Sequence, residues 1–432
     1  MSNQSPRVLL DMSIKSLLKD KALSMEAIGH LPGELFPSVF MEAFIRGHTE
    51  VLKAMVQSWP FTSLPLGALM NMKKAGSLDT QKDVLQAEKM VLQAVLDGID
   101  MLLRKEVCSR MLKLQVLDMR VTRQDFWRVW AERKLENCSS ESMNWGIAQK
   151  IGPREPSKRP LKVILDLWIT EECLRPWTST ILQWIRERKD LVQLHCLQLC
   201  ITAMSFQWVT EVLEVLELDS VREVDVSPWW PICTLAQFAP FLSQMENLHK
   251  LILCDICVPA SMPPEEREQL VTEVTFPFLK LHSLREVFMD TVEFLEGHMD
   301  QFLRCLTSPL ETLSVTNCQL SLSDWNHLPF SEKIRQLKHL DLSCTKLTSF
   351  SPESLQLLLS SVAATLTTLH LENCGITDAQ VSAFLPALSS CSQLTTFCFI
   401  KNSMSIYALK NLLCHTTRLS NLTLELYSVP QE

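Results

Sequence analysis

The chain has 432 residues, a formal net charge of -8 and a 47% share of apolar residues, with only 10 glycines. This composition excludes an intrinsically disordered chain and gives no support for a glycine-rich phosphate loop. The net charge is negative, whereas nucleic-acid binders usually have an excess of Lys and Arg, so we expect no direct nucleic-acid partner.

Targeting signals and disulfides are not indicated either. Met1 to Ser13 holds no continuous apolar stretch behind a basic start, and no later stretch approaches the roughly 18 apolar residues of a membrane span. We therefore expect a cytoplasmic protein, neither secreted nor bound to a membrane, with a nuclear share that the sequence leaves open. The 15 cysteines are an odd number, which favours reduced thiols over a disulfide framework.

Apolar residues at three- and four-residue steps make residues 1–105 a helical N-terminal region. A proline suited to a first helical turn and a threonine suited to an N-cap support the helix starts within it. The expected helices are one amphipathic helix from Ser13 to His30, ended by Leu31-Pro32, a second with Pro37 in its first turn, a third capped by Thr49, and a long helix from Val84 to Lys105.

We interpret residues 106–193 as degenerate first repeats. Lys113 to Arg120 alternates between apolar and polar residues like a strand, Val163 to Trp168 predicts a second strand, and Trp177 to Arg188 predicts a helix. Residues 136–160 contain serines and prolines without apolar periodicity, which predicts a flexible loop.

Residues 194–432 repeat the pattern leucine-x-x-leucine-x-leucine, with spacings of 25 to 29 residues and one of 36. This is the leucine-rich repeat signature, in which strand leucines point inward and a Cys or Asn turns the chain to the next layer, as Cys374 would. We therefore expect an α/β leucine-rich repeat solenoid, a horseshoe with a parallel concave sheet and convex helices, preceded by a helical cap. The long interval, from Leu248 to Leu284, puts Pro263 to Arg267 on a surface loop.

The expected concave face consists of the residues that alternate with the inward leucines of each strand. A solenoid's inner face is its commonest docking surface, whereas a plain solvated sheet is the simpler interpretation for any one residue. Several carboxylates make this face mildly acidic, which favours a protein substrate that presents Lys or Arg. The predicted face includes Phe288, Asp290, Ser314, Thr316, His339, Asp341, His370, Glu372, Ile400, Lys401, Thr423 and Glu425. The candidate substrate-binding residues are Phe288, Asp290, His339, Asp341, His370, Glu372 and Lys401.

Four segments of the first 120 residues resemble one protein family. They read LPGELFPSVFMEAF (Leu31 to Phe44), LKAMVQSWPFTSLPLGALM (Leu52 to Met70), AVLDGIDMLL (Ala94 to Leu103) and KLQVLDMR (Lys113 to Arg120). They are similar to the family of the preferentially expressed antigen in melanoma, which includes rodent germ-cell members called oogenesins, and the similarity spans nearly the whole chain. The resemblance implies a leucine-rich horseshoe, expression in the germ line or early embryo, and effects on transcription, differentiation, proliferation and apoptosis. For the best understood members it implies service as substrate receptor of a cullin-2 RING ubiquitin ligase, recruited through elongins B and C.

Two short motifs near the N-terminus fit the attachment that this resemblance implies. In an elongin-binding box, a leucine enters a pocket, and a small residue about one turn later lets the partner helix approach. This box is matched, loosely and without its usual Cys, by Ser16, Leu17, Leu18 and Ala22. A cullin-2 box would follow a short distance downstream as hydrophobic-Pro-x-x-hydrophobic, and is matched by Leu31, Pro32, Leu35 and Val39. The simpler alternative is a helical cap that covers the leucines of the first repeat.

Metal binding and catalysis are poorly supported. Cys254-x-x-Cys257, with Cys196 and Cys200, suggests zinc, but the earlier pair is separated by three residues within a strand whose side chains also serve the repeat. The histidines are scattered, and neither a nucleophile elbow nor a metalloprotease helix is present. We expect no metal, no cofactor and no catalytic residue.

Two leucine-x-x-leucine-leucine motifs, Leu355 to Leu359 and Leu409 to Leu413, resemble the segments by which coregulators dock on nuclear receptors. Their leucines are also needed for the core of a repeat helix at this spacing, which is the simpler interpretation.

The functional hypothesis is a monomeric, non-catalytic substrate receptor that binds elongin B, elongin C, cullin-2 and a protein substrate. The alternative is a binding scaffold or transcriptional corepressor without ligase attachment.

Overall fold

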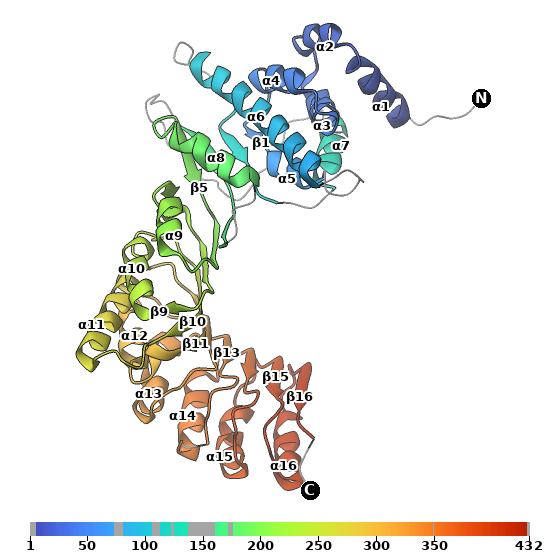
Figure 1. Ribbon diagram of the computed structural model, residues 1–432. Coiled ribbons are helices and arrows are strands. Elements are labelled where there is room, and N and C mark those ends of the chain that lie inside the picture. Colours follow the sequence, from blue (N-terminus) through green and yellow to red (C-terminus); the bar gives the residue numbers. More distant parts are fainter. Residues whose placement is uncertain are drawn as a thin grey trace, which may run out of the picture. The chain divides into compact units, whose positions relative to one another are not determined.

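The computed structural model describes residues 6–72, 81–105, 113–121, 125–136, 160–171, 176–348 and 350–429. The chain forms two compact units (Figure 1). The N-terminal unit comprises Met1–Asp166 and Cys173–His195, and the repeat unit comprises Leu167–Glu172 and Cys196–Glu432. The chain therefore passes from one unit to the other three times, so neither unit is a single continuous stretch of sequence.

The first helical prediction, one helix from Ser13 to His30, is wrong. The chain forms two helices, α1 (Pro6–Leu17) and α2 (Lys21–Ile28). Asp20 is the N-cap of α2, and its carboxylate accepts two backbone N–H groups of the first turn at 2.9 and 3.1 Å. An aspartate in this position satisfies donors that a helix start leaves unpaired, so local capping outweighs the continuous apolar periodicity.

The other predicted helices of the N-terminal unit are confirmed. In α3 (Phe36–Arg46) a proline occupies the first turn, and α4 (Thr49–Gln57) begins at the predicted threonine, although His48 is its N-cap. The long helix is α6 (Gln81–Lys105). The remaining helices are a short 3-10 helix (Gly33–Leu35), α5 (Leu66–Met72), α7 (Phe126–Glu136) and α8 (Pro176–Arg186).

A small parallel sheet in this unit orders its strands β1-β2-β3-β5. These are β1 (Ser63–Leu64), β2 (Val116–Asp118), β3 (Leu161–Ile164) and β5 (Val192–His195). The predicted strand within Lys113 to Arg120 is confirmed as β2, whereas Val163 to Trp168 is divided between β3 and β4 (Leu167–Ile169), which belong to different sheets. The predicted loop at 136–160 lies outside the described residues except at its two ends.

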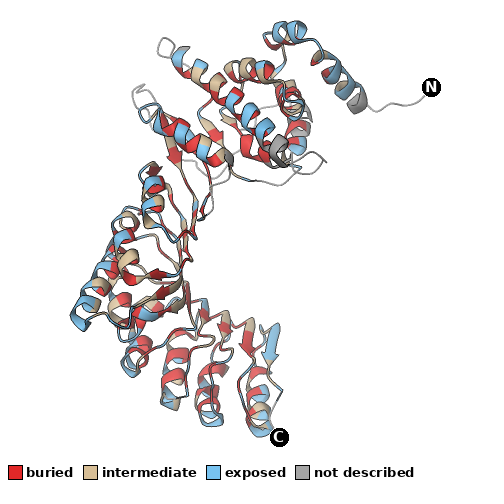
Figure 2. Cartoon of the chain, viewed as in Figure 1, coloured by how far each residue is buried: buried red, intermediate tan, exposed pale blue. Residues whose placement is uncertain are grey.

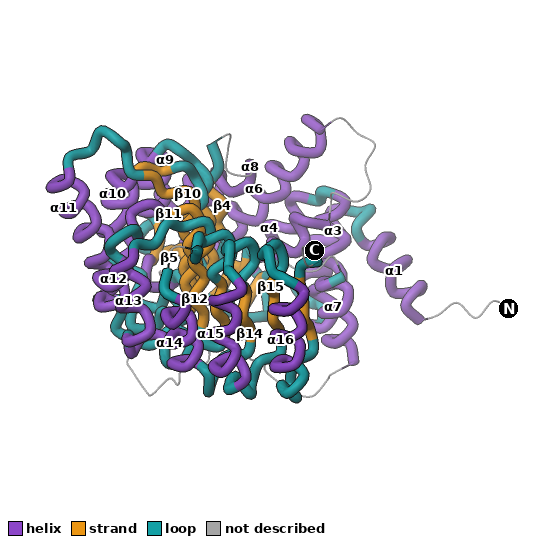
Figure 3. The backbone as a smooth tube through the Cα atoms, turned by 90° about the horizontal axis from the view of Figure 1, so that it is seen from below, coloured by secondary structure: helices purple, strands orange, loops and turns teal. Residues whose placement is uncertain are grey.

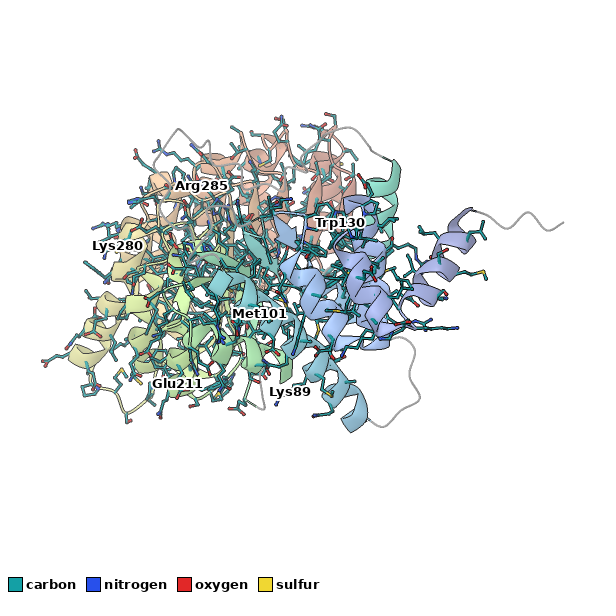
Figure 4. All side chains as sticks on the ribbon, turned by 90° about the horizontal axis from the view of Figure 1, so that it is seen from above. Lys89, Met101, Trp130, Glu211, Lys280 and Arg285 are labelled. Atoms are coloured by element: carbon teal, nitrogen blue, oxygen red, sulfur yellow. The ribbon has the colours of Figure 1, made fainter. Side chains whose placement is uncertain are left out.

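Aromatic side chains form much of the core of the N-terminal unit. Trp127 lies 5.0 Å from Trp130 in an edge-to-face arrangement and 5.7 Å from the stacked ring of Phe40, measured between ring centroids. The indole N–H of Trp127 donates to the carbonyl oxygen of Pro65 at 2.8 Å, so the buried polar atom is satisfied. Trp130 is labelled on α7 in Figure 4.

Two residues of α6, a glycine and an aspartate, hold this helix against α4 and α8. A Cβ atom on Gly98 would lie 2.9 Å from the backbone oxygen of Lys53, so the glycine permits close packing of α6 on α4. Asp100 accepts two hydrogen bonds from the guanidinium of Arg188, at 2.6 and 2.7 Å, and one from the indole of Trp184 at 3.1 Å. This bidentate pair joins α6 to the end of α8.

The repeat unit is built on an eleven-stranded, wholly parallel sheet. Its main path runs from β4 at one edge through β6, β8 and β10 to β16, and β9 pairs beside β10. The strands are β6 (Gln198–Ile201), β8 (Glu223–Val226), β9 (Trp230–Pro231), β10 (Lys250–Cys257), β11 (Glu286–Val292), β12 (Thr312–Thr316), β13 (His339–Asp341), β14 (Thr368–His370), β15 (Thr396–Phe399) and β16 (Leu424–Tyr427).

One helix follows most strands and lies on the convex side, outside the stacked strands of Figure 3. The predicted surface loop at Pro263 to Arg267 is wrong, because Pro263 caps α11 and the following residues form its first turn. Within the described segments, no helix is both long and apolar enough to cross a bilayer. The helices are α9 (Phe206–Leu213), α10 (Ile232–Leu242), α11 (Pro264–Thr275), α12 (Met299–Cys305), α13 (Leu322–His327), α14 (Pro352–Val362), α15 (Asp378–Ser389) and α16 (Ile406–Thr416).

The leucine-rich repeat fold is confirmed by the parallel stacked strands and by the alternation of buried and less buried residues along most of them, such as β8 and β10 (Figure 2). The inward positions of one repeat, Leu310, Leu313, Val315 and Cys318, are all buried. Burying one such side chain contributes roughly 1.5 to 3 kcal/mol relative to leaving it exposed. The stacked inward side chains therefore form a continuous core along the repeat unit.

Six consecutive repeats, from β10 to β15, each contain one residue with a left-handed backbone, within the last residues of the strand or shortly after it. The left-handed residues have φ between 52° and 61°, although none is glycine, and they are Asp255, Thr291, Asn317, Cys344, Asn373 and Lys401. Their backbone N–H groups bridge the layers: that of Cys344, for example, donates to the carbonyl oxygen of Glu372 at 2.7 Å. The inter-layer hydrogen bonds offset the steric cost of this conformation.

In four of these repeats the next residue is a Cys, Thr or Asn that turns the chain, as the sequence pattern predicts: Cys318, Thr345, Cys374 and Asn402. The polar side chain of this residue pairs with backbone groups of the layer before: the hydroxyl of Thr345 donates to Val315 at 2.9 Å, and the thiol of Cys374 donates to Leu342 at 3.2 Å. Asn402 is buried and bonds with backbone groups on both sides of the turn. These side chains satisfy polar backbone atoms that the turn would otherwise bury unpaired.

Candidate partner-binding surfaces

The residues of the predicted elongin box do not share one helix. Ser16 and Leu17 lie in the last turn of α1, Leu18 lies in the turn that follows, and Ala22 lies in α2. Leu18 is only 2% exposed, whereas Ser16 and Ala22 are exposed and Leu17 is half-buried. The structure therefore brings the box residues to one helix junction, with Leu18 directed into the unit.

A set of exposed apolar side chains on α1 and α2 was missed at the sequence level. Leu9 and Met12 on α1 are 55% and 56% exposed, and Leu23 and Met25 on α2 are also exposed. Leu9, Met12 and Ser16 follow the three- and four-residue steps that place side chains on one face of a helix. We call Leu9, Met12, Leu23 and Met25 the α1–α2 apolar surface.

The predicted cullin-binding residues surround the start of α3. Pro32 is exposed and precedes the short 3-10 helix, while Leu31 and Leu35 are half-buried. Val39 lies within α3 and is 3% exposed, so its side chain belongs to the core of the unit. Of the four residues, Pro32, Leu31 and Leu35 have surface that a partner can contact.

The outward residues of the repeat unit form cross-strand rows whose order the strand register fixes. The middle row consists of Trp168, Cys200, Asp225, Ile252, Phe288, Ser314, Asp341, His370, Cys398 and Leu426. The row before it consists of Gln198, Glu223, Lys250, Glu286, Thr312, His339, Thr368, Thr396 and Leu424. These rows contain five of the twelve predicted concave residues: Phe288, Ser314, His339, Asp341 and His370.

Six of the predicted concave positions need correction. Glu425 pairs in register with Phe397, a buried residue of the core, so its position is on the inner side of the strand. Ser314 is outward by register but is nevertheless buried. Lys401 follows β15 in the left-handed turn and does not lie on a strand. Glu372, Ile400 and Thr423 likewise lie just outside their strands. Alternation alone cannot locate where a strand ends, and this accounts for the misplacement of Lys401.

The C-terminal part of the concave face neutralises its own charges. The Nδ1 atom of His370 lies 3.6 Å from a carboxylate oxygen of Asp341, and the ammonium of Lys401 lies 2.6 Å from Glu372. Hydrogen bonding to Asp341 raises the pKa of His370, and Glu372 likewise raises the pKa of Lys401. Burial alone would raise the pKa of Asp341, but its hydrogen bonds with His370 and Ser343 outweigh this effect and lower it.

The N-terminal part of the concave face has a different character. Trp168 is 61% exposed because it alternates with the buried Leu167 and Ile169. The ammonium of Lys250 lies 5.2 Å from the centre of the Phe288 ring. Sequence reasoning identified Phe288 but missed Trp168, although the same alternation rule, extended by one strand towards the N-terminus, would have found it.

The cysteines that suggested zinc do not form a ligand set. Cys254 and Cys257 occupy the same strand, β10, while Cys196 is buried and its thiol donates to the carbonyl of Gln198 at 3.1 Å. Burial raises the pKa of Cys200 to about 11, which disfavours the thiolate that zinc requires. Among the residues that the structure describes, no group of three or more His, Cys, Asp or Glu side chains is placed to hold a metal ion.

The two leucine-x-x-leucine-leucine motifs lie on α14 and α16. Leu355, Leu358 and Leu359 are buried, as the repeat core requires. In the second motif Leu412 is buried, whereas Leu413 is exposed. The three defining leucines of the first motif are thus used for packing, although Leu357 between them is exposed, whereas the second motif has an exposed defining leucine, Leu413.

Two family models match most of the chain: the PRAME N-terminal domain matches residues 5–127, and the PRAME C-terminal domain matches residues 161–432. Human PRAME family member 12 is 46% identical over 432 residues, covering 100% of this chain and 86% of the relative. Human PRAME family member 20 is 45% identical over the whole chain and 88% of the relative. Among solved structures, the leucine-rich repeat-containing protein LegL7 from Legionella pneumophila is similar over 62% of this chain and 83% of its own, with 15% identity and a TM-score of 0.32. The full-length matches and both domain models show that this chain belongs to the PRAME family.

Proposed function

We propose that this chain is the substrate-recognition subunit of a cullin-2 RING ubiquitin ligase. In this proposal the N-terminal unit recruits elongins B and C and cullin-2, and the repeat unit holds a protein substrate for ubiquitination. The chain itself contributes no catalytic side chain, because its role is to bring the substrate close to the ligase's partner enzyme. The family resemblance implies that the protein is expressed in germ or early embryonic cells.

The α1–α2 apolar surface is the observation that supports recruitment most directly. Leu9 and Met12 each expose more than half of their side chains, and neighbouring α2 adds two further exposed apolar residues. A helical cap that served only its own core would direct such side chains inward, whereas several exposed apolar side chains on two successive helices favour a protein-binding surface. We therefore assign the elongin contact to this surface together with Ser16, Leu17 and Ala22. Leu18 is buried and contributes by packing the helix junction against the unit.

The cullin contact is proposed at the segment between α2 and α3. Pro32 is exposed there, and Leu31 and Leu35 retain partial exposure. Val39 contributes indirectly, because its buried side chain holds α3 against the unit. The substrate contact is proposed on the concave rows of the repeat unit, which present outward side chains on a rigid parallel sheet.

Affinity purification of the full chain from cells that express it tests the proposal. We expect elongin B, elongin C and cullin-2 in amounts comparable to the chain itself, and proteasome inhibition should increase the amount of the co-purified substrate. A purification that lacks all three partners would contradict ligase attachment. That outcome would favour the alternative, a scaffold or transcriptional corepressor that acts by occupying its partner.

A further inference from the structure

The part of the concave face between β4 and β11 presents aromatic and aliphatic side chains to solvent. The middle row runs there from Trp168 through Cys200, Asp225 and Ile252 to Phe288. Trp168 is 61% exposed, and Ile252 and Phe288 are half-buried. We call this part of the sheet the β4–β11 face.

Carboxylates surround these apolar side chains. Asp225 lies in the middle row itself, Glu223 and Glu286 lie in the row before it, and Asp290 follows Phe288 by two residues. The side chain of Asp290 accepts hydrogen bonds from Thr316 and Asn317, both at 2.6 Å, which are neutral donors. Asp225 accepts from Ser227, and Glu223 accepts from Gln198 at 3.1 Å.

Within the described residues, none of these four carboxylates has an ion-pair partner. The only lysine or arginine of the two rows, Lys250, stands between Glu223 and Glu286 in register but directs its ammonium over the Phe288 ring. Four carboxylates are therefore opposed by one ammonium. By contrast, Asp341 and Glu372 at the other end of the sheet are paired with His370 and Lys401.

The negative charge of the carboxylates and the exposed indole of Trp168 together indicate what kind of ligand the β4–β11 face binds. Trp168 offers an indole face, the best aromatic partner for a cation, and Asp225 lies two strands away across the short Cys200 side chain. Two strand spacings are about 10 Å, a separation that lets one arginine stack on the indole while a neighbouring one meets the carboxylate. A guanidinium suits both groups, because it stacks on aromatic rings and pairs with carboxylates in a fork geometry. Nucleic acid is disfavoured, because its phosphates would be repelled by the same carboxylates.

We propose that the β4–β11 face binds an extended, arginine-rich segment of a protein, with an apolar residue of that segment held against Ile252 and Phe288. The five strands of the face span about 19 Å, which matches roughly six residues of extended chain. The inference rests on the proposed function in one respect, that the concave face is the substrate site. It places the recognition of basic residues on Asp225 and Asp290 and away from Asp341 and Glu372.

Fluorescence polarisation on the purified full chain tests this inference. The probe is a labelled 12-residue peptide with four arginines separated by serines and one central leucine, and the control peptide carries citrulline in place of every arginine. We expect the arginine peptide to bind at least tenfold more tightly than the citrulline peptide. Its affinity should weaken as salt is raised, because the contacts are surface charges.

Two variants locate the site. Trp168→Ala and the double variant Asp225→Asn with Asp290→Asn should each weaken binding of the arginine peptide about tenfold or more. The matched control is Glu214→Gln with Glu246→Gln, which removes the same charge from exposed residues outside the face and should change affinity less than twofold. Thermal melting of each variant checks folding, and Trp168→Ala remains informative if the double variant is unstable, because Trp168 is exposed.

Three results would overturn the inference: no binding of the arginine peptide to the wild-type chain, equal binding of the citrulline peptide, or wild-type affinity in the folded Trp168→Ala variant. The assay contains neither elongins nor cullin, so its outcome is independent of ligase attachment. A chain that binds the arginine peptide but purifies without elongins would retain this inference and contradict the proposed ligase role.

Discussion

At the scale of single residues, the repeat unit depends on side chains that bond to its own turns. Asn402 accepts the N–H groups of Cys374 and Ile376, at 3.0 and 3.3 Å, and donates to the carbonyls of Leu371 and Phe399, at 2.6 and 3.4 Å. The sequence pattern predicts that a Cys or Asn turns the chain here. The pattern does not predict which carbonyls and N–H groups are served, since these belong to a neighbouring repeat and depend on how two turns stack.

Asn402→Ala should lower the free energy of unfolding by about 2 to 4 kcal/mol, because it leaves buried backbone donors and an acceptor without partners. Urea denaturation of the full chain measures this loss. Gln393→Ala serves as the control, since Gln393 is exposed near the same repeat and its replacement should change stability by no more than about 0.5 kcal/mol. Equal small losses in both variants would show that the turn does not depend on the asparagine.

The Asp341–His370 pair should make stability depend on pH. The folded-state pKa of His370 is raised by Asp341, so the pair's contribution is complete below the unfolded pKa of histidine, about 6.5, and is lost as pH rises through the folded pKa. We therefore expect the urea midpoint of the wild-type chain to fall more between pH 6 and pH 8, roughly the range around that pKa, than that of Asp341→Asn. Glu332→Gln, an exposed change elsewhere, should keep the wild-type slope. Parallel pH profiles for all three proteins would argue against a coupled pair.

At the scale of elements, periodicity predicted most helices and strands but not their boundaries. The helix expected from Ser13 to His30 is divided because Asp20 caps a new start, and the loop expected at Pro263 to Arg267 is the first turn of α11. Both errors have the same physical origin. Capping aspartates and prolines are compatible with turns and with helix starts, and tertiary packing decides between them.

The divided N-terminal helix separates two kinds of leucine, and this predicts different effects of their replacement. Leu9→Ser with Met12→Ser removes exposed side chains, so we expect loss of co-purified elongins with an unchanged melting temperature. Leu18→Ser removes a buried side chain and should destabilise the N-terminal helices by roughly 1.5 to 3 kcal/mol, which hydrogen exchange can detect as faster exchange in α1 and α2.

Met90→Ser with Met101→Ser is the matched control, because both methionines are exposed on α6 and lie outside the α1–α2 apolar surface. Elongins should co-purify normally with this variant. Retention of elongins by the Leu9 and Met12 variant, at wild-type levels, would place the contact elsewhere in the N-terminal unit.

At the scale of the whole molecule, the sequence predicted the solenoid because its leucine spacing is repeated many times, and each repeat contacts mainly its neighbours. Surface sites are predicted less well. Asp341 was expected on a concave strand and lies in β13, whereas Glu372 was also expected on a strand but lies two residues beyond β14. Their pairing with His370 and Lys401 depends on side-chain conformations that a register does not specify. Trp168 was missed because the single strand expected from Val163 to Trp168 is divided, and Trp168 belongs to β4 at the edge of the repeat sheet.

The alternation of inward and outward residues on the strands has a consequence for how such a protein changes over generations. Leu167 and Ile169 hold β4 in the sheet, while Trp168 between them can be replaced with little effect on folding. Mutations at exposed, unpaired outward positions such as this one are therefore available to selection on binding alone. A duplicated gene can acquire a new target by altering one row of side chains, and its product inherits a scaffold that already folds.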